Sequence, residues 1–188
     1  RSSAASDVYK RQARDHYYQP GWTMVGAGVF TPEQTRKAEA DVMPKGVEWI
    51  RLPAITIDPE RQAITLGDGD TIAYRVLIVA PGLRLAWEKI AGLTDALGRN
   101  GVTSNYRCDL APYTYQLAQE LQRGRALFSQ PPMPIKCAGA PQKAMYLSCD
   151  IWRECGVLPA IDVEFHNAGA ALFGVATYVP APVSYTHL

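Results

Sequence analysis

Cys137 lies in a segment whose residue types could support nucleophilic sulfur chemistry. The segment Pro134–Lys143 reads PIKCAGAPQK and joins a predicted strand to a predicted helix. Pro141 suits the first turn of that helix, where its missing N–H costs nothing. Cys137 would then lie just before a helix N-terminus and beside Lys136, and both features favour the thiolate over the thiol. Two interpretations stay open, a reactive thiolate or a small buried residue, because free cysteine is among the most buried residue types.

The elements that would position Cys137 follow one another as helix, strand, loop, helix and strand. Leucines at helical spacing predict the first helix, which stops before Gly124. The prolines between the first strand and Cys137 exclude a helix and keep the backbone extended. The expected ranges are Leu110–Gln122, Ala126–Ser129, Gln142–Glu154 and Ile161–Phe165. This order is typical of an α/β unit.

The middle of the chain indicates an antiparallel meander followed by a buried strand. Val76–Ala80 is a continuous apolar run, which fits a parallel strand covered on both faces, and it leads into Pro81 and Gly82. Alternating apolar residues and intervening turns predict four short strands before it. These strands are expected at Val47–Ile50, Ala54–Ile57, Ala63–Leu66 and Thr71–Tyr74.

The segment before the meander carries weaker signals. His16–Trp22 is aromatic and is interrupted by Pro20 and Gly21, which predicts a loop. Met24–Val29 contains G-x-G without a third glycine at the required spacing, so a close-packed turn is favoured over a phosphate-binding loop. A short amphipathic helix is expected after Pro32.

Composition and charge limit the classes of function. The chain has 188 residues, of which 47% are apolar and 20% are charged, and its net charge is +1. This composition is typical of a soluble globular protein, and without a basic cluster nothing suggests nucleic-acid binding. The nearest candidate for a membrane span, Ala168–Val179, is short, broken by glycine and closed by Pro180.

The cysteines and histidines do not form a metal-binding pattern. They contain no C-x-x-C pair and are not grouped with one another, so a zinc site is not expected. Their irregular spacing, in a chain long enough to form its own core, favours reduced thiols over disulfides. The cysteines are Cys108, Cys137, Cys149 and Cys155, and the histidines of the part expected to be native are His16 and His166.

The two ends of the chain are expected to be translations of one DNA element in opposite orientations. Asp7–Gln12 can be encoded by GATGTGTATAAGAGACAG, and the reverse complement of that string gives Val183–His187 in another frame. The element resembles a transposon end used in sequencing libraries. We therefore expect residues 1–12 and 183–188 to be non-native, and the native part to be an internal piece of a longer gene.

Taken together, these residues resemble the sulfide:quinone oxidoreductases, in particular their mitochondrial-type branch. The segment around Cys137 is the most specific part of the resemblance, which covers almost the whole native part. The other residues that carry it are His16–Pro20, Trp22, Val25–Gly28, Gly46–Ile50, Tyr74, Arg75, Ser104–Tyr106, Met145–Ser148 and Phe173–Val175.

The resemblance implies an α/β fold, a fragment of a Rossmann-like flavoprotein with two dinucleotide-binding domains and an antiparallel β-meander. Residues 13–107 would form part of the FAD-binding domain, without its first strand and glycine-rich loop. Residues 108–182 would begin the second domain, which carries the active-site cysteine. The partner cysteine would lie in a C-terminal part outside the chain. We therefore expect the chain alone to be inactive and not to retain FAD.

The resemblance also implies an enzyme that oxidises hydrogen sulfide. Cys137 would take up sulfide sulfur as a persulfide, electrons would pass through FAD to quinone, and a sulfane-sulfur acceptor would remove the sulfur. Gln19, Ala54, Ala80 and Gly82 would contact the FAD. Without the family pattern, Gln19 is an ordinary loop amide and Ala54 a packing residue. Peripheral attachment to a mitochondrial or bacterial inner membrane would come from a region outside the chain.

Ser129–Lys143 distinguishes this interpretation from an NADH-oxidising flavoprotein of the same architecture. Such an enzyme needs a glycine-rich pyrophosphate loop at the first strand–helix junction of its second domain. The segment holds four prolines and one glycine, so the sequence excludes NADH as the electron donor. A flavoprotein sulfide dehydrogenase with a cytochrome acceptor and a non-catalytic flavin-fold binding module remain alternatives.

Overall fold

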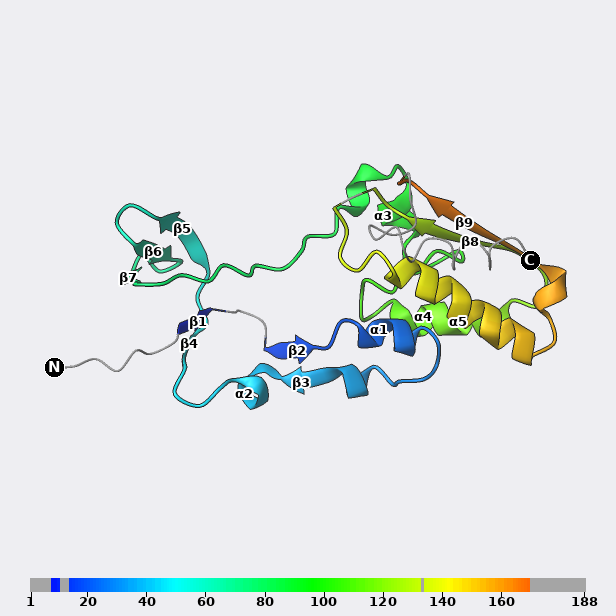
Figure 1. Cartoon of the computed structure of the whole chain (residues 1–188), viewed down its shortest axis with the longest axis horizontal. Helices are drawn as coiled ribbons and strands as arrows, with labels where there is room; N and C mark the ends of the chain where they lie inside the picture. Colours follow the sequence, from blue (N-terminus) through cyan, green and yellow to red (C-terminus); the bar gives the residue numbers. More distant parts are fainter. Residues whose placement is uncertain (1–7, 11–13, 133, 170–188) are drawn as a thin grey trace, which may run out of the picture. The chain divides into compact units, whose positions relative to one another are not determined.

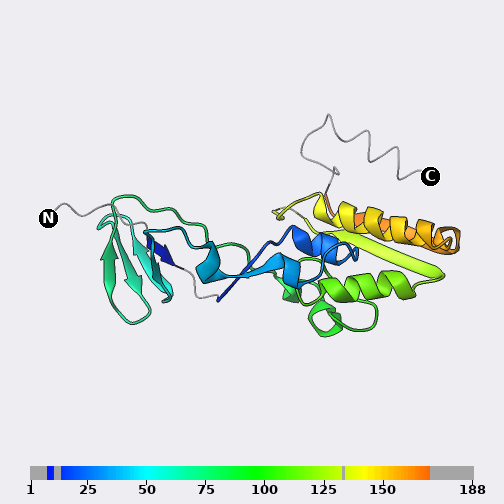
Figure 2. The same ribbon diagram turned by 90° about the horizontal axis from the view of Figure 1, so that it is seen from below.

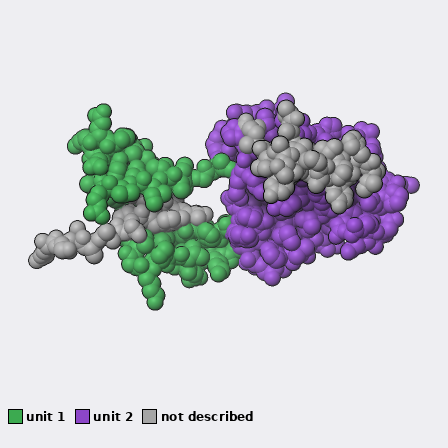
Figure 3. Space-filling view, viewed as in Figure 1, with its two compact units in different colours: residues 1–17, 36–83 green, residues 18–35, 84–188 purple. Residues whose placement is uncertain are grey.

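The computed structural model describes residues 8–10, 14–132 and 134–169 (Figure 1). These residues belong to two compact units, coloured separately in Figure 3. Unit 1 comprises the described residues of the ranges 1–17 and 36–83, and unit 2 comprises those of the ranges 18–35 and 84–188. The ends expected to be non-native, apart from residues 8–10, and most of Ala168–Val179 lie outside the described residues. The domain boundary expected at residue 107 stays a prediction.

Unit 1 is built from short paired strands. β1 (Val8–Lys10) runs parallel to β4 (Glu48–Ile50), β2 (Asp15–Tyr17) runs antiparallel to β3 (Arg36–Ala38), and α2 (Glu39–Val42) follows β3. The loop expected over His16–Trp22 is wrong in part, because this range contains the end of β2 and the start of α1 (Gly21–Val25). Pairing with β3 decides the conformation here, and the local aromatic pattern carries no information about that partner.

The predicted antiparallel meander is confirmed for three of its four expected strands, whereas the expected strand Val47–Ile50 forms β4 and pairs in parallel with β1 instead. The three strands are β5 (Ala54–Asp58), β6 (Ala63–Leu66) and β7 (Thr71–Ala73), which pair in chain order. Aspartate side chains stabilise its turns, since Asp58 accepts a hydrogen bond from the backbone N–H of Arg61 at 2.9 Å. Ile64 and Leu66 alternate with polar residues along β6 and are buried. The two-residue period of the sequence therefore specified the inward face.

The strand expected over Val76–Ala80 is wrong. The described structure has irregular backbone there, and the exposed fractions of Val76, Ile78 and Val79 are 77%, 87% and 59%. A strand buried on both faces needs neighbouring strands and covering helices. No described strand pairs with this segment. The apolar composition alone is therefore not enough to form a strand.

Unit 2 contains the predicted sequence of helix, strand, helix and strand. Its main elements are α1, α4 (Ala111–Glu120), β8 (Gly124–Gln130), α5 (Ala140–Glu154) and β9 (Ile161–Asn167). β8 and β9 are parallel, with Gly124 opposite Ile161 and Gln130 opposite Asn167. α5 packs against β8 and contacts α4, and Figure 2 shows α5 running along β8. Shorter elements are η1 (Glu33–Thr35), η2 (Trp87–Lys89), α3 (Leu93–Ala96) and η3 (Leu158–Ala160).

The helix expected after Pro32 is shortened to a single 3₁₀ turn, η1. β3 begins directly after it at Arg36 and pairs with β2. Strand pairing therefore replaces the helix that the charge pattern favoured.

Trp152 lies at the centre of the core of unit 2. Only 3% of its surface is exposed, its indole N–H donates a hydrogen bond of 2.7 Å to the carbonyl of Ala118, and its ring centroid lies 6.3 Å from that of Phe128. The indole therefore joins α5 to α4 and to β8. Buried aromatic residues contribute much to core stability because of their large area, and the buried N–H here has its partner.

The G-x-G sequence of Gly26 and Gly28 forms the close-packed turn that the sequence favoured. A Cβ atom on Gly26 would lie 2.5 Å from the side-chain oxygen of Asn105, and one on Gly28 would lie 2.3 Å from the ring of Tyr115. Gly28 also has a φ of +73°. These glycines allow the end of α1 to lie close to α4 and to the segment that precedes α4.

Candidate functional site

Cys137 lies on the loop between β8 and α5, as expected. β8 ends at Gln130, α5 begins at Ala140 after Gly139, and Pro141 occupies the first helical turn. Within that first turn α5 has no acidic residue. The partial positive charge of the helix N-terminus is therefore not offset by a carboxylate of the same turn.

Cys137 is exposed and has an unusual backbone conformation. Its thiol is free and accessible, so the alternative of a buried packing residue is wrong. Its φ is +55°, in the left-handed region, which costs a residue other than glycine about 1–2 kcal/mol. Among the described residues other than glycine, Gln62 and Asn100 share this feature, and both lie in turns. Such strain persists only where surrounding contacts maintain it.

Tyr106 provides one such contact. Its hydroxyl donates a hydrogen bond of 2.7 Å to the carbonyl of Lys136 and lies 3.3 Å from the carbonyl oxygen of Cys137. Burial of the hydroxyl and the nearby Cys137 raise the pKa of Tyr106 to about 12. The phenol therefore stays protonated at neutral pH and remains a hydrogen-bond donor.

Sequence reasoning assigned no role to Tyr106. Its hydrogen bonds join two segments that are distant along the chain, so they leave no local pattern. The one signal available was the position of Tyr106 in Ser104–Tyr106, a segment already noted for the resemblance.

The other cysteines differ from Cys137 in burial or position. Cys108 and Cys149 are half-buried, and burial raises the pKa of the Cys149 thiol. Cys155 is exposed and lies directly after α5. All four cysteines are free thiols. The described part of the chain holds no group of three or more histidine, cysteine, aspartate or glutamate side chains arranged to bind a metal ion.

The residues predicted to contact FAD are divided between the units. Gln19 is exposed in the turn before α1 and belongs to unit 2 with Cys137, whereas Ala54, Ala80 and Gly82 are exposed residues of unit 1. The structure therefore does not bring the four together within one unit. Their roles stay predictions.

Three of these residues have local features that suit contact with a cofactor. The pairing of β5 with β6 is irregular between Ala54 and Thr56, which frees backbone groups from the regular ladder. Gly82 has a φ of +81°, and no atom lies within 4 Å of the position where its Cβ would be. Gln19 is exposed to solvent, and its backbone carbonyl accepts a hydrogen bond from the N–H of Trp22 at the start of α1.

Two buried hydrogen-bond acceptors lie in the segments that precede Cys137 and adjoin Tyr106. The side-chain oxygens of Gln130, the last residue of β8, and of Asn105, next to Tyr106, have no hydrogen-bond partner among the described residues. Buried polar atoms are normally hydrogen-bonded. A ligand that donates hydrogen bonds could satisfy either of them.

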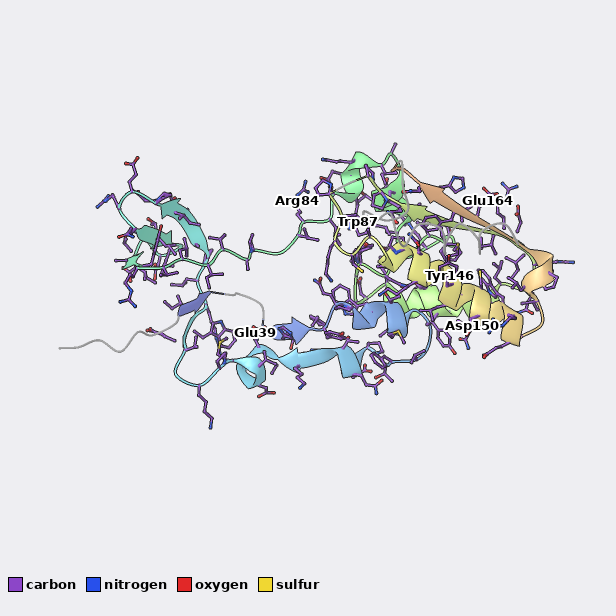
Figure 4. The ribbon with its side chains drawn as sticks, in the orientation of Figure 1. Glu39, Arg84, Trp87, Tyr146, Asp150 and Glu164 are labelled. Atoms are coloured by element: carbon purple, nitrogen blue, oxygen red, sulfur yellow. The ribbon has the colours of Figure 1, made fainter. Side chains whose placement is uncertain are left out.

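Glu39 is a separate buried titratable group, labelled in Figure 4, and it belongs to unit 1. Its carboxylate lies 3.7 Å from Nδ1 of His16 on β2. Its backbone N–H donates to the carbonyl of Arg14. These contacts fix α2 against β2, so Glu39 has a structural explanation and needs no role in catalysis.

Comparison with known proteins gives a consistent result. No family model matches the chain. The chain is 40% identical over 172 residues to the mitochondrial sulfide:quinone oxidoreductase of Dictyostelium discoideum, a match that covers 91% of the chain and 38% of that relative. It is 39% identical over 166 residues to the mitochondrial sulfide:quinone oxidoreductase of Mus musculus, covering 88% of the chain and 37% of that relative. The chain thus spans less than two-fifths of the length of these relatives.

The fold also matches a solved structure. The sulfide:quinone oxidoreductase of the hyperthermophilic bacterium Aquifex aeolicus superimposes with a TM-score of 0.76 over 97% of the chain and 43% of that protein, at 19% sequence identity. The expected fold class, a fragment of a Rossmann-like α/β flavoprotein with a β-meander, is confirmed by this match. The sequence comparisons show that the chain belongs to the sulfide:quinone oxidoreductase family, and the solved structure shows the same fold.

Proposed function

We propose that the whole protein, of which this chain is part, oxidises hydrogen sulfide and passes the electrons through FAD to quinone. The observation that carries the proposal is the exposed, conformationally strained Cys137 at the junction of β8 and α5. The similarity to mitochondrial sulfide:quinone oxidoreductases over 91% of the chain supports it.

The proposed chemistry at Cys137 is persulfide formation. A bond forms between its Sγ and the sulfur of hydrosulfide. Starting from the thiolate and HS⁻, this step releases one proton and two electrons. Accessibility of Sγ is the first requirement for such a reaction, and the exposure of Cys137 meets it.

A bound FAD would supply the two-electron acceptor that this step requires. Gln19, Ala54, Ala80 and Gly82 are the residues that we propose to hold it. All four are exposed, and the open space beside Gly82 allows a ligand to approach its backbone closely.

The β8–α5 junction also supports sulfide over NADH as the electron source. A dinucleotide pyrophosphate binds to a glycine-rich loop at a helix N-terminus. Here the loop contains Pro131, Pro132 and Pro134, and Cys137 stands before the helix. The backbone N–H groups that prolines lack are the groups such a loop would use.

The membrane partner is part of the proposal. None of the helices in the described residues is sufficiently long and apolar to cross a bilayer. We propose that the whole protein associates peripherally with the inner membrane, where quinone is available, and transfers its sulfur to a small sulfane-sulfur acceptor.

The test is Cys137→Ser in the flavin-loaded full-length protein. We expect sulfide-dependent quinone reduction to fall by roughly 10³-fold or more, the scale of removing a covalent nucleophile, while the flavin absorbance is kept. The matched control is Cys155→Ser, which removes another exposed free thiol of unit 2 and should leave turnover unchanged. Near-normal turnover of Cys137→Ser would refute the proposal.

A further inference from the structure

The Cys137 loop has a backbone conformation that its own residue type disfavours. Cysteine does not favour the left-handed region, yet Cys137 has a φ of +55°. The carbonyl of the same residue accepts a hydrogen bond of 2.9 Å from the N–H of Ala140, the first residue of α5. The left-handed residue therefore begins a turn that leads directly into the helix.

Tyr106 attaches this turn to a different part of unit 2. It lies in the segment between α3 and α4, and its hydroxyl reaches the carbonyls of Lys136 and Cys137. The shorter contact, 2.7 Å to Lys136, is the main hydrogen bond, and the 3.3 Å contact to Cys137 shares the same proton. One of these carbonyls precedes the N–Cα bond of Cys137 and the other follows it. The hydroxyl therefore contacts the backbone on both sides of the bond about which φ is measured.

We propose that Tyr106 is a positioning residue, which holds Cys137 in the left-handed conformation that presents its thiol for reaction. This inference rests on the proposed function for the role of the thiol, but its structural part does not. Because the pKa of Tyr106 is raised to about 12, the phenol remains a donor throughout the range in which a thiol ionises. Tyr106 touches the backbone of the loop and is not assigned any proton transfer.

The chain offers a matched pair of tyrosines for the test. Tyr106→Phe removes the hydroxyl and keeps the ring, which leaves the two carbonyls without this donor. Tyr113 is the control, because its hydroxyl also bonds a backbone group, accepting from the N–H of Gly101 at 3.1 Å. Tyr113→Phe therefore removes a comparable hydrogen bond that does not touch the Cys137 loop.

The first measurement is amide hydrogen exchange in the flavin-loaded full-length protein. In Tyr106→Phe the N–H of Ala140 should exchange about two- to tenfold faster, the scale of one net hydrogen bond, because the turn at Cys137 opens more often. In Tyr113→Phe that amide should exchange as in the wild type. Wild-type exchange at Ala140 in Tyr106→Phe would overturn the proposal, and so would equal acceleration in both variants.

The second measurement separates two half-reactions by stopped-flow absorbance. Tyr106→Phe should slow flavin reduction by sulfide about two- to tenfold and leave reoxidation of the reduced flavin by quinone unchanged. A general structural defect would slow both, and that result would overturn a positioning role. If the proposed function is wrong, sulfide oxidation survives Cys137→Ser. That result does not affect the hydrogen-exchange measurement at Ala140, which tests the positioning role by itself.

Discussion

The two units differ in how far they bury their own apolar residues. In the described part of the chain, the buried hydrophobic residues of unit 1 are Ile64 and Leu66 of the meander. Glu39, whose side chain carries a carboxyl group, is also buried among the described residues of unit 1. Unit 2 buries a larger set, which comprises Trp22, Val25, Leu110, Ala111, Ala118, Met145, Trp152 and Ile161.

This difference shows what a strand or helix needs beyond its own pattern. In unit 2, α5 covers β8 and contacts α4, and the predicted elements form. In unit 1, the apolar run Val76–Ala80 has no covering layer in the described structure, and it forms no strand. A segment with the composition of a buried strand becomes one only where other elements remove it from water.

The largest expected effect comes from removing the central side chain of unit 2. Trp152→Ala should lower the free energy of unfolding by about 3–5 kcal/mol, because it leaves a large cavity and an unpaired carbonyl on Ala118. Urea unfolding followed by circular dichroism measures this loss. Trp87→Ala, at a partly exposed tryptophan of the same unit, is the control and should cost much less. Equal losses in the two variants would contradict the assignment of the core.

An intermediate effect is expected from the close-packed glycine of unit 2. Gly28→Ala combines a disfavoured φ with a clash against the ring of Tyr115 and should cost about 2–4 kcal/mol. Gly46→Ala in unit 1 is the matched control, since Gly46 has a φ of +83° and nothing within 4 Å of its Cβ position. It should cost only the backbone part, about 1–2 kcal/mol. Thermal unfolding measures the stability loss of each variant, and the difference between the two losses is the contribution of packing against Tyr115. Equal losses would show that this contribution is absent.

The smallest effect is expected in the exposed apolar segment of unit 1. Ile78→Thr should change the free energy of unfolding of the 188-residue chain by no more than about 0.5 kcal/mol, because Ile78 is already exposed to water. Ile64→Thr places a hydroxyl at a buried site of the meander and should be clearly destabilising. Similar losses in parallel urea titrations would show that Ile78 is covered in solution.

Local signals in the sequence were reliable where a single residue type has a specific backbone requirement. Prolines marked the loop before Cys137, Pro141 marked the first turn of α5, and glycine marked the boundary between α4 and β8. Alternation of apolar residues correctly predicted the meander. These signals work because φ restrictions and the strand period act within a few residues.

Predictions that depended on a distant partner were less reliable. β2 and β3 replaced an expected loop and an expected helix because they pair with each other. Val76–Ala80 remained irregular for the opposite reason, the lack of a partner in the described structure. The same limit applies to the candidate site, where the role of Cys137 could be proposed from its neighbours along the chain, but the contact with Tyr106 could not.

The sequence by itself determined where Cys137 lies, on a proline-bounded loop before a helix, because proline and helix-terminus preferences are local. It also determined the order of α4, β8, α5 and β9 in unit 2. Only the tertiary structure decided that Cys137 is exposed, that its backbone is left-handed, and that the hydroxyl of Tyr106 donates to the adjoining carbonyl of Lys136. These properties depend on packing between segments far apart in the chain, which no local pattern encodes.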